Sequence, residues 1–462
     1  MSVILLNAFV QVWVNIITCK VPQASPRAYA DDLAATAPTV RILRRVLSLT
    51  QKFAQATGMR LNVKKCWVWG FSPRCRLELG RCFINGQKVP LVTEERYLGA
   101  YLSFGRKRRR TRIDHKASAC KAVCERIEML GLPLEARAVL AATAVVPKAL
   151  YACAATPPSR KALQGLRSRV ARAVWGQGNR WRAPEVLFTI LCKGHLVDPV
   201  QAFGYQTLLT HHRVLGRHPH LRALFNDIMT QRQTNLRPHI GGPVKALLDA
   251  YKLGNMEPNG TDGGFHYVSG DGDLMEDHLI DSDVFRISHV FRECLRREQW
   301  DRLDLRRPGF SGINGDVDRK ATQWFGGRLR GLQRYRWRCI LTGAIPTAHR
   351  LYRMGVLDGN ACPCCGQAAE TLTHIVDSCP ALDAIRYQTF RPPGWHSLPE
   401  CLRLHGIMPE TLFLAADYSN DAEGRKECAA DVQETLLKLM ETREAALGLP
   451  TPQPRWAPAR NS

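Results

Sequence analysis

Residues 25–36 read SPRAYADDLAAT and place two neighbouring aspartates, Asp31 and Asp32, between two short apolar segments. We predict strands at residues 27–30 and 33–36, joined by a turn at the aspartates. Two carboxylates at the tip of a hairpin repel each other unless a cation relieves the repulsion, and Mg²⁺ is held by one or two carboxylates together with phosphates. The pattern predicts either a magnesium site or a solvated turn, and the tetrapeptide alone favours the turn.

The sequence that follows this hairpin adds further structural signals. An amphipathic helix is predicted after Pro38, because apolar residues recur at helical spacing as far as Phe53. More short strands are predicted in the region beyond it. That region contains three notable stretches, which are GMRLNVKKC (58–66), RYLGAYLSF (96–104) and RKRRRTR (106–112).

With these features in this order along the sequence, the chain resembles the C-terminal part of a reverse transcriptase of the non-LTR (LINE-type) retrotransposons. The palm of that family has an aspartate hairpin, a helix, a G-x-x-x-N-x-x-K stretch and a Tyr-Leu-Gly hairpin that grips the primer. Residues 2–8 (SVILLNA) also resemble the second half of the family's Pro-x-Ser helix. The resemblance implies an α+β fold, in which a partial polymerase palm is followed by a mainly α-helical thumb and C-terminal domains with a small zinc knuckle.

The resemblance also implies roles for the matching residues. Asp31 would be a Mg²⁺ ligand and Asp32 would support it. Lys65 would lie near the phosphates of the incoming nucleotide, with an ordinary surface lysine as the alternative. Tyr29 would shape the side of the primer terminus. The primer grip would consist of Tyr97, Leu98 and Gly99.

The sequence departs from the family pattern at its beginning. The family's other essential metal aspartate lies on a strand before the Pro-x-Ser helix, and these 462 residues start after that point. Two-metal phosphoryl transfer needs ions about 3.5–4 Å apart, and one hairpin does not hold both. We therefore expect an RNA-directed DNA polymerase by descent, from a truncated gene model or a decayed copy, that is inactive alone. The alternative is a non-catalytic, zinc-containing nucleic-acid-binding protein.

Residues 362–379 read CPCCGQAAETLTHIVDSC and predict a zinc site. The spacing C-x2-C-x8-H-x4-C supplies four N/S ligands, which suits a closed, structural zinc site. The predicted ligands are Cys362, Cys365, His374 and Cys379, with Cys364 as a possible replacement for Cys365. A helix is predicted over residues 368–378. A set of buried thiols is the alternative, and the family resemblance adds a similar knuckle downstream of the thumb.

The chain is strongly basic, with 65 Lys and Arg against 41 Asp and Glu and a formal net charge of +24. A polyanion relieves the self-repulsion of such a chain, and we expect an RNA template and a DNA primer or target as partners. Candidate contacts are Arg106, Lys107, Arg108, Arg109, Arg110 and Arg112. A nuclear localisation signal and a solvated loop are the other interpretations of that run.

Two later stretches, residues 167–182 and 324–338, interleave arginines with aromatic residues. Such a pattern suits phosphate contact combined with base stacking. Aromatic residues in a helical stretch are more often part of a core, so both interpretations stay open for each stretch.

Sixteen cysteines scattered through a long chain predict reduced thiols in an intracellular compartment, nuclear or cytoplasmic. Residues 1–18 are apolar but lack a charged leading region, and they predict a buried helix rather than a signal peptide or a membrane span. No membrane partner is expected. We divide the chain into a partial palm (1–110), a helical thumb-like domain (111–250), an acidic Gly-rich linker (251–285), a basic helical region (286–355), the zinc knuckle (356–385) and a C-terminal helix with a disordered tail (386–462).

Overall fold

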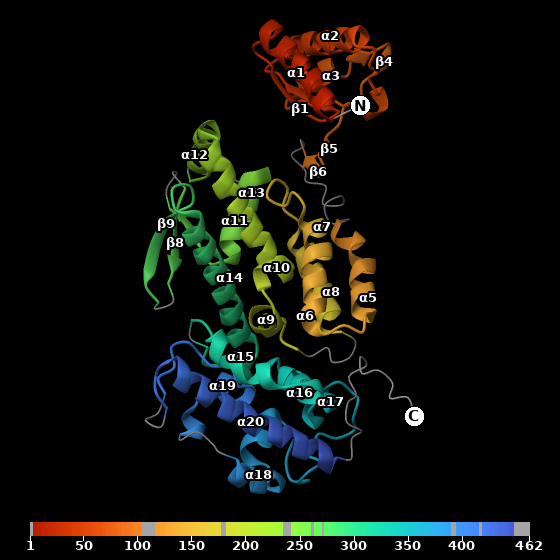
Figure 1. The fold of residues 1–462 in the computed structure, drawn as a ribbon. Coiled ribbons are helices and arrows are strands. Elements are labelled where there is room, and N and C mark those ends of the chain that lie inside the picture. Colours follow the sequence, from red (N-terminus) through yellow and green to blue (C-terminus); the bar gives the residue numbers. More distant parts are fainter. Residues whose placement is uncertain are drawn as a thin grey trace. The chain divides into compact units, whose positions relative to one another are not determined.

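The computed structural model describes residues 3–103, 116–176, 182–233, 242–259, 263–269, 272–313, 315–389, 394–414 and 418–447. The chain forms two compact units, Met1–Arg109 and Arg110–Ser462. Helices dominate, and the small sheets have two or three antiparallel strands (Figure 1). This agrees with the predicted α+β class. The predicted disordered tail lies outside the described residues.

The first unit packs helices against short hairpins. Its elements are α1 (Val3–Lys20), β1 (Ser25–Tyr29), β2 (Asp32–Thr36), α2 (Val40–Ala56), η1 (Val63–Lys65), α3 (Pro73–Leu79), β3 (Phe83–Ile84), β4 (Gln87–Lys88), β5 (Glu94–Tyr97) and β6 (Ala100–Ser103). Thr39 caps α2 by accepting a hydrogen bond from the backbone N–H of Ile42 at 3.3 Å. Ala28 and Leu33 of the first hairpin pack on a core of α1 and α2. The helices therefore hold this hairpin in place.

Helix α1 is only partly the buried helix that its composition predicts. Trp13 and Ile17 in its second half are buried in the core. In its first half, the side chain of Ile4 is 80% exposed, and Leu5 and Phe9 are also exposed. The prediction was wrong for this half, because apolar composition promotes burial only where another element covers the helix face.

The second unit begins with helices. They are α5 (Lys121–Met129), α6 (Leu134–Leu140), the π-turn η2 (Ala141–Val145), α7 (Val146–Leu150), α8 (Arg160–Trp175), α9 (Pro184–Val186), the π-turn η3 (Leu187–Leu191), α10 (Gly194–Val197), α11 (Pro199–Arg217), α12 (Pro219–Gln233) and α13 (Gly242–Leu253). Apolar residues of α5, α6 and α8 share one core. Helices that pack on a shared core thus build this part of the unit.

The predicted acidic linker at residues 251–285 is instead a folded sheet. Strands β7 (Glu257–Asn259), β8 (Gly264–Val268) and β9 (Leu274–His278) pair in sequence order. Phe265 of β8 is fully buried against Tyr251 and Phe291, with ring centroids 5.6 and 5.8 Å away. The linker prediction was wrong because one short apolar strand anchors the sheet, while the glycines and acidic residues surround it.

The C-terminal part of the second unit gathers around one long helix. Its elements are α14 (Val284–Arg306), η4 (Pro308–Phe310), α15 (Arg319–Arg328), α16 (Gly331–Leu341), α17 (Ala348–Arg353), the π-turn η5 (His374–Ser378), η6 (Pro380–Leu382), α18 (Asp383–Gln388), η7 (Trp395–Ser397), α19 (Glu400–His405) and α20 (Ala422–Ala446). Helix α20 lies against α15, α16 and α19 (Figure 1).

One hydrophobic core spans the three C-terminal segments into which the sequence was divided. It contains Ile340 of α16, Cys362 and Cys379 of the cysteine-rich segment, and Leu436 of α20. The cysteine-rich segment is therefore part of a larger helical core. None of the described helices has both the length and the apolar composition that crossing a membrane requires.

Candidate metal centre

The first two candidate ligands come from one tight turn. The backbone N–H of Gly366 donates to the carbonyl of Cys362 at 2.7 Å, and Gly366 has a φ of 71°, which glycine adopts without strain. The N–H of Cys362 donates to Ala368 at 2.6 Å. Closing the chain in this way brings the thiols of Cys362 and Cys365 to the same side of the turn.

The other two candidate ligands come from the π-turn η5 and the residue after it. The predicted helix over residues 368–378 is shorter than expected: it starts at Leu372, because Ala369 forms a β-bridge with Ala361. The π-turn carries His374 at its start, and Cys379 follows its end. π-turns are rare and occur often at functional sites.

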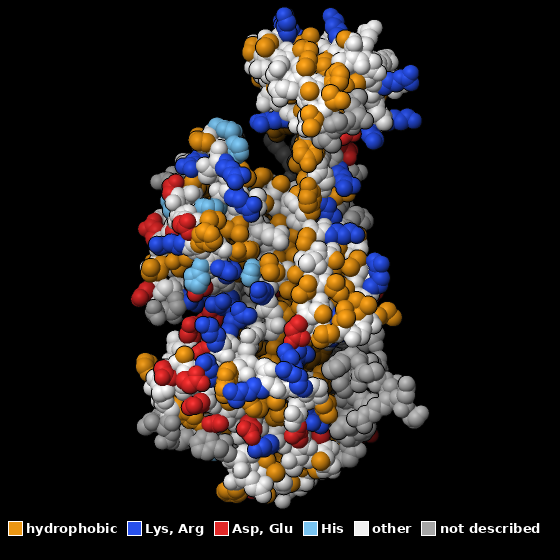
Figure 2. Space-filling view, in the orientation of Figure 1, with side chains coloured by type: hydrophobic (Ala, Val, Ile, Leu, Met, Phe, Trp, Pro, Cys, Tyr) orange, Lys and Arg blue, Asp and Glu red, His pale blue; other side chains and the backbone are white. Residues whose placement is uncertain are grey.

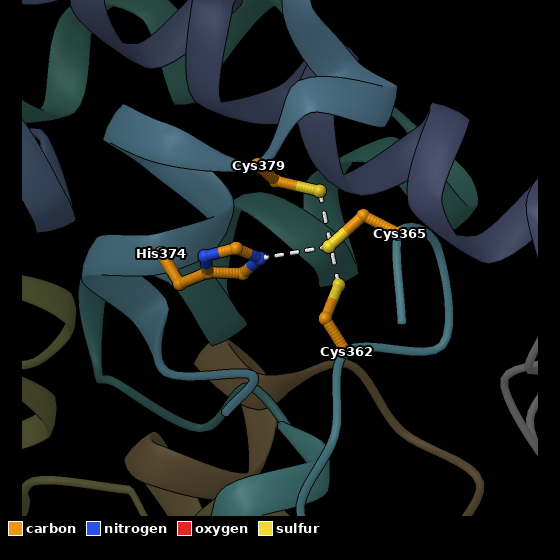
Figure 3. Close-up of side chains that lie close together, drawn as sticks. All are labelled: Cys362, Cys365, His374 and Cys379. Atoms are coloured by element: carbon orange, nitrogen blue, oxygen red, sulfur yellow. Dashed lines mark hydrogen bonds between the residues drawn. The ribbon is translucent and has the colours of Figure 1, made fainter. Parts of the chain in front are cut away.

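The four side chains point toward one another (Figure 3). The sulfurs of Cys362 and Cys379 are 3.7 Å apart, and His374 Nε2 lies 3.4 Å from the sulfur of Cys365. All four ligand atoms lie within 4.8 Å of one another. Zn–S bonds of about 2.3 Å and Zn–N bonds of about 2.0 Å, arranged as a tetrahedron, require S···S and S···N separations of about 3.7 and 3.5 Å. The cluster fits zinc.

The thiols are reduced in the structure. A disulfide needs an S–S distance of about 2.05 Å, which is far shorter than the 3.7 Å between Cys362 and Cys379. All sixteen cysteines of the chain lie among the described residues, and all sixteen are free. Free thiols leave the four ligands available to a metal ion.

Burial makes this a closed site. Cys362 is 1% exposed, Cys379 is 0% and His374 is 9%. The backbone N–H of Gln367 lowers the pKa of Cys365, whereas burial and then the neighbouring Cys362 raise the pKa of Cys379 to about 12. A divalent cation offsets the cost of holding several thiolates together. With four protein ligands there is no open position for a substrate, which indicates a structural role.

The geometry separates Cys364 from Cys365. Cys365 groups with the histidine, whereas Cys364 groups with Cys362 and Glu370. The carboxylate of Glu370 is already bound by Arg443. The fourth member of the cluster is therefore Cys365 and not Cys364, a choice that the sequence left open.

Buried polar contacts fasten the cluster to the surrounding helices. Glu370 is fully buried and accepts two hydrogen bonds from Arg443 of α20, at 2.6 and 2.8 Å. Asp377 of the π-turn accepts from Trp395 at 3.0 Å and from Arg403 of α19. The sequence analysis missed these residues, since a single Glu or Arg far along the chain carries no local signal of its partner.

The acidic hairpin forms with a shift of one position. Tyr29 pairs with Asp32, so the two-residue turn consists of Ala30 and Asp31 and not of the two aspartates. Ala30 adopts a φ of 51° to close this turn. Asp31 and Asp32 are exposed, and the side chain of Tyr29 is 67% exposed.

The second hairpin has the same two-residue geometry. Tyr97 pairs with Ala100, and Leu98 and Gly99 form the turn with φ values of 47° and 79°. Burial raises the pKa of Tyr97, and the negative charge of Asp32 raises it further. The Tyr-Leu-Gly hairpin and the acidic hairpin are therefore within electrostatic reach of each other, although 65 residues separate Asp32 from Tyr97.

The geometry does not support a magnesium site at the acidic hairpin. In the part of the chain that the structure describes, groups of three or more possible metal ligands occur only around Cys362. Lys65 is exposed at the end of η1, and no described hydrogen bond or ion pair joins it to either aspartate. The predicted contacts at Arg106, Lys107, Arg108, Arg109, Arg110 and Arg112 lie outside the described residues.

Several arginines of the two aromatic-rich stretches serve the fold. Arg336 bonds Glu441 and Glu444 at 3.0 and 2.6 Å, and Arg338 bonds Glu135 at 2.6 Å. Arg167 is buried against carboxylates, with Asp198 at 3.0 Å. Paired in this way, these side chains are held by carboxylates within the fold.

Comparison with known proteins adds one finding. Residues 316–385 match the family model described as zinc-binding in reverse transcriptase. The matched region contains the four clustered side chains, and the match supports a relationship between this chain and reverse transcriptases. Together with the cluster, it supports a structural zinc. Comparison with curated proteins and with solved structures gave no match.

Proposed function

We propose, from the reverse-transcriptase zinc-binding match at residues 316–385, that this chain is the C-terminal part of a non-LTR retrotransposon reverse transcriptase and that it handles nucleic acid. In this proposal the first unit is part of the palm, and the helices that follow it are the thumb. The zinc knuckle holds the C-terminal core together, and RNA template and DNA primer or target are the partners.

The arrangement of the first unit supports the palm assignment. A hairpin with two exposed carboxylates is held on two helices, and the charge of Asp32 reaches Tyr97 of a second, Tyr-Leu-Gly hairpin. A polymerase palm needs such a neighbourhood, because the primer end must lie beside the acidic turn. The excess of positive charge on the chain suits the phosphates of both strands.

We expect the 462-residue chain alone to extend no primer on an RNA template. Asp31 and Asp32 are adjacent residues of one hairpin, and the described residues bring no third carboxylate to them. Two-metal transfer needs both ions to be held. The measurement is a primer-extension assay with Mg²⁺ or Mn²⁺. DNA synthesis that Asp31→Ala abolishes would show that the hairpin is catalytic in this chain and would overturn the expectation.

We also expect the chain to bind RNA and DNA with a strong dependence on salt. Each phosphate contact made by Lys or Arg releases counterions, so the logarithm of the binding constant falls linearly with the logarithm of salt concentration. Fluorescence anisotropy with a labelled oligonucleotide, measured from about 50 to 300 mM salt, gives the slope. Absence of binding at the lowest salt would reject the nucleic-acid role, and only the structural role of the zinc site would stand.

A further inference from the structure

Most buried or half-buried arginines in the second unit are neutralised by carboxylates. Arg443 binds Glu370, and Arg425 binds Asp318 at 3.0 Å. Three cations near the junction of α10, α14 and α15 differ: Lys193, Arg292 and Arg319. Among the described residues, none of the three forms an ion pair with a carboxylate. The nearest charge compensation recorded for Arg319 is the electrostatic influence of Asp316, which does not form an ion pair with it.

These three cations and Arg296 form one surface, which we call the central basic surface (Lys193, Arg292, Arg296 and Arg319). Arg292 and Arg296 are four residues apart on α14, so they lie on the same face of the helix and about 6 Å apart along it. Arg319 reaches from the start of α15 to donate to the carbonyl of Cys192 at 3.3 Å. Cys192 directly precedes Lys193.

Figure 2 shows Lys and Arg side chains gathered where α10, α14 and α15 meet. Lys193 is exposed, and Arg292 and Arg319 are half-buried. The Nε of Arg319 is buried without a hydrogen-bond partner. The surface is therefore open to an incoming partner at Lys193 and at the exposed parts of Arg292 and Arg319.

Few negative charges border this surface. Asp316 is 3% exposed and is occupied by Arg296 and by the indole N–H of Trp300, at 2.7 and 2.9 Å. Glu410 lies beside Asp316, and burial followed by Asp316 raises its pKa. Two further carboxylates nearby are paired with other residues: Glu293 contacts His289 at 3.2 Å, and Asp318 binds Arg425 at 3.0 Å.

The pKa of His195 responds to the positive charge of this surface. Burial, and then the charges of Arg292, Lys193, Arg319 and Arg296, together lower this pKa to about 4. All four cations therefore act on one imidazole of α10. Because His195 is neutral at pH 7, it adds no positive charge to the repulsion among them.

Neutral donors extend the surface along α14. Ser288 is one turn before Arg292, and its hydroxyl lies 2.7 Å from the hydroxyl of Tyr205. The ring of Tyr205 packs edge-on against His195, with centroids 5.0 Å apart. A row of hydroxyl and guanidinium donors suits the phosphate oxygens of a polynucleotide, which accept hydrogen bonds from both kinds of group.

We propose that the central basic surface binds the sugar-phosphate backbone of a nucleic-acid strand. The inference rests on the proposed nucleic-acid role and deepens it by assigning the site to α10, α14 and α15. A nucleic acid fits better than an acidic protein, since its phosphates form a regular row of charges that matches cations repeating along a helix. The contacts are to backbone phosphates and carry no base specificity.

The test is the salt dependence of oligonucleotide binding for a triple variant, Lys193→Gln, Arg292→Gln and Arg319→Gln. Removing three phosphate contacts to a single strand lowers the slope of log K against log salt by about 2, which weakens binding about 100-fold at 0.1 M salt. A matched control removes the same charge from exposed lysines of α8, α13 and α20, with Lys161→Gln, Lys252→Gln and Lys438→Gln. The control is expected to change the slope by less than half as much.

A second variant, Lys193→Gln with Arg292→Gln, keeps the contact between Arg319 and Cys192 and guards against loss of folding. It is expected to lower the slope by about 1.4. If the wild type binds the oligonucleotide, and the surface variants and the lysine control change the slope equally, the surface assignment is wrong while the proposed function stands. If the wild type binds no oligonucleotide, both fail. The chain is also tested with polyglutamate. If polyglutamate binds as tightly as the oligonucleotide and the same variants lose this binding, the surface is assigned to an acidic protein instead.

Discussion

Cys362→Ser is expected to abolish the binding of about one zinc equivalent per chain and to unfold the C-terminal core. Cys362 is 1% exposed and belongs to the same core as α16 and α20. Structural zinc sites contribute apparent binding free energies of about 10–16 kcal/mol, which is comparable with the whole stability of an ordinary domain, about 5–15 kcal/mol. Metal analysis of purified protein and thermal unfolding, with and without a chelator, measure the two effects.

Two cysteines provide matched controls for this experiment. Cys364→Ser changes the thiol next to Cys365 in the sequence. Cys364 lies outside the four-residue cluster, so this variant should keep the zinc. Cys428→Ser removes a buried thiol from the same core that is not part of the four-residue cluster, and should also keep the zinc. Loss of zinc in Cys364→Ser but not in Cys365→Ser would reverse the ligand assignment. An unchanged zinc content in Cys362→Ser and His374→Ala would remove the metal site altogether.

Glu370→Gln is expected to lower the free energy of unfolding by about 3–5 kcal/mol, because it leaves Arg443 as an uncompensated buried charge. Glu370 is fully buried, Arg443 is 4% exposed, and their two hydrogen bonds are 2.6 and 2.8 Å long. The pair joins the segment that follows the Ala361–Ala369 bridge, beside the Cys/His cluster, to α20. Urea unfolding of the zinc-loaded protein at pH 7 measures the loss.

The same helix supplies the control for the buried pair. Lys438 and Glu434 of α20 form an exposed ion pair at 2.8 Å, and exposed pairs contribute about 0–1 kcal/mol. Glu434→Gln removes the same charge and should have little effect. If Glu370→Gln is as mild as Glu434→Gln, then Arg443 reaches water or another partner in solution, and the buried pair does not hold the knuckle to α20.

Features set by short spacing could be predicted from the sequence. The acidic hairpin was predicted from the short segments on either side of its turn, and the Cys/His cluster from cysteine and histidine spacing within 18 residues, whereas the Tyr-Leu-Gly hairpin was implied by the family resemblance. In each case the backbone geometry of one turn brings the side chains together. The errors were also local: the acidic turn is shifted by one residue, and the helix carrying His374 starts at Leu372.

The partners of charged residues were decided by the tertiary structure alone. Arg338 and Glu135 are 203 residues apart in the sequence, and Arg443 and Glu370 are 73 apart. Composition shows an excess of basic residues but cannot show which of them remain without a carboxylate. The central basic surface therefore became visible only after folding had placed many of the other arginines in ion pairs.

By itself, the sequence indicated the α+β class, the acidic hairpin and the clustered Cys and His residues apart from the choice between Cys364 and Cys365. The tertiary structure decided that choice, turned the acidic segment around Phe265 into a sheet, and left half of α1 exposed. The physical reason is range. Turns and spacings depend on a few neighbouring dihedral angles, whereas burial and charge pairing depend on which distant elements pack together.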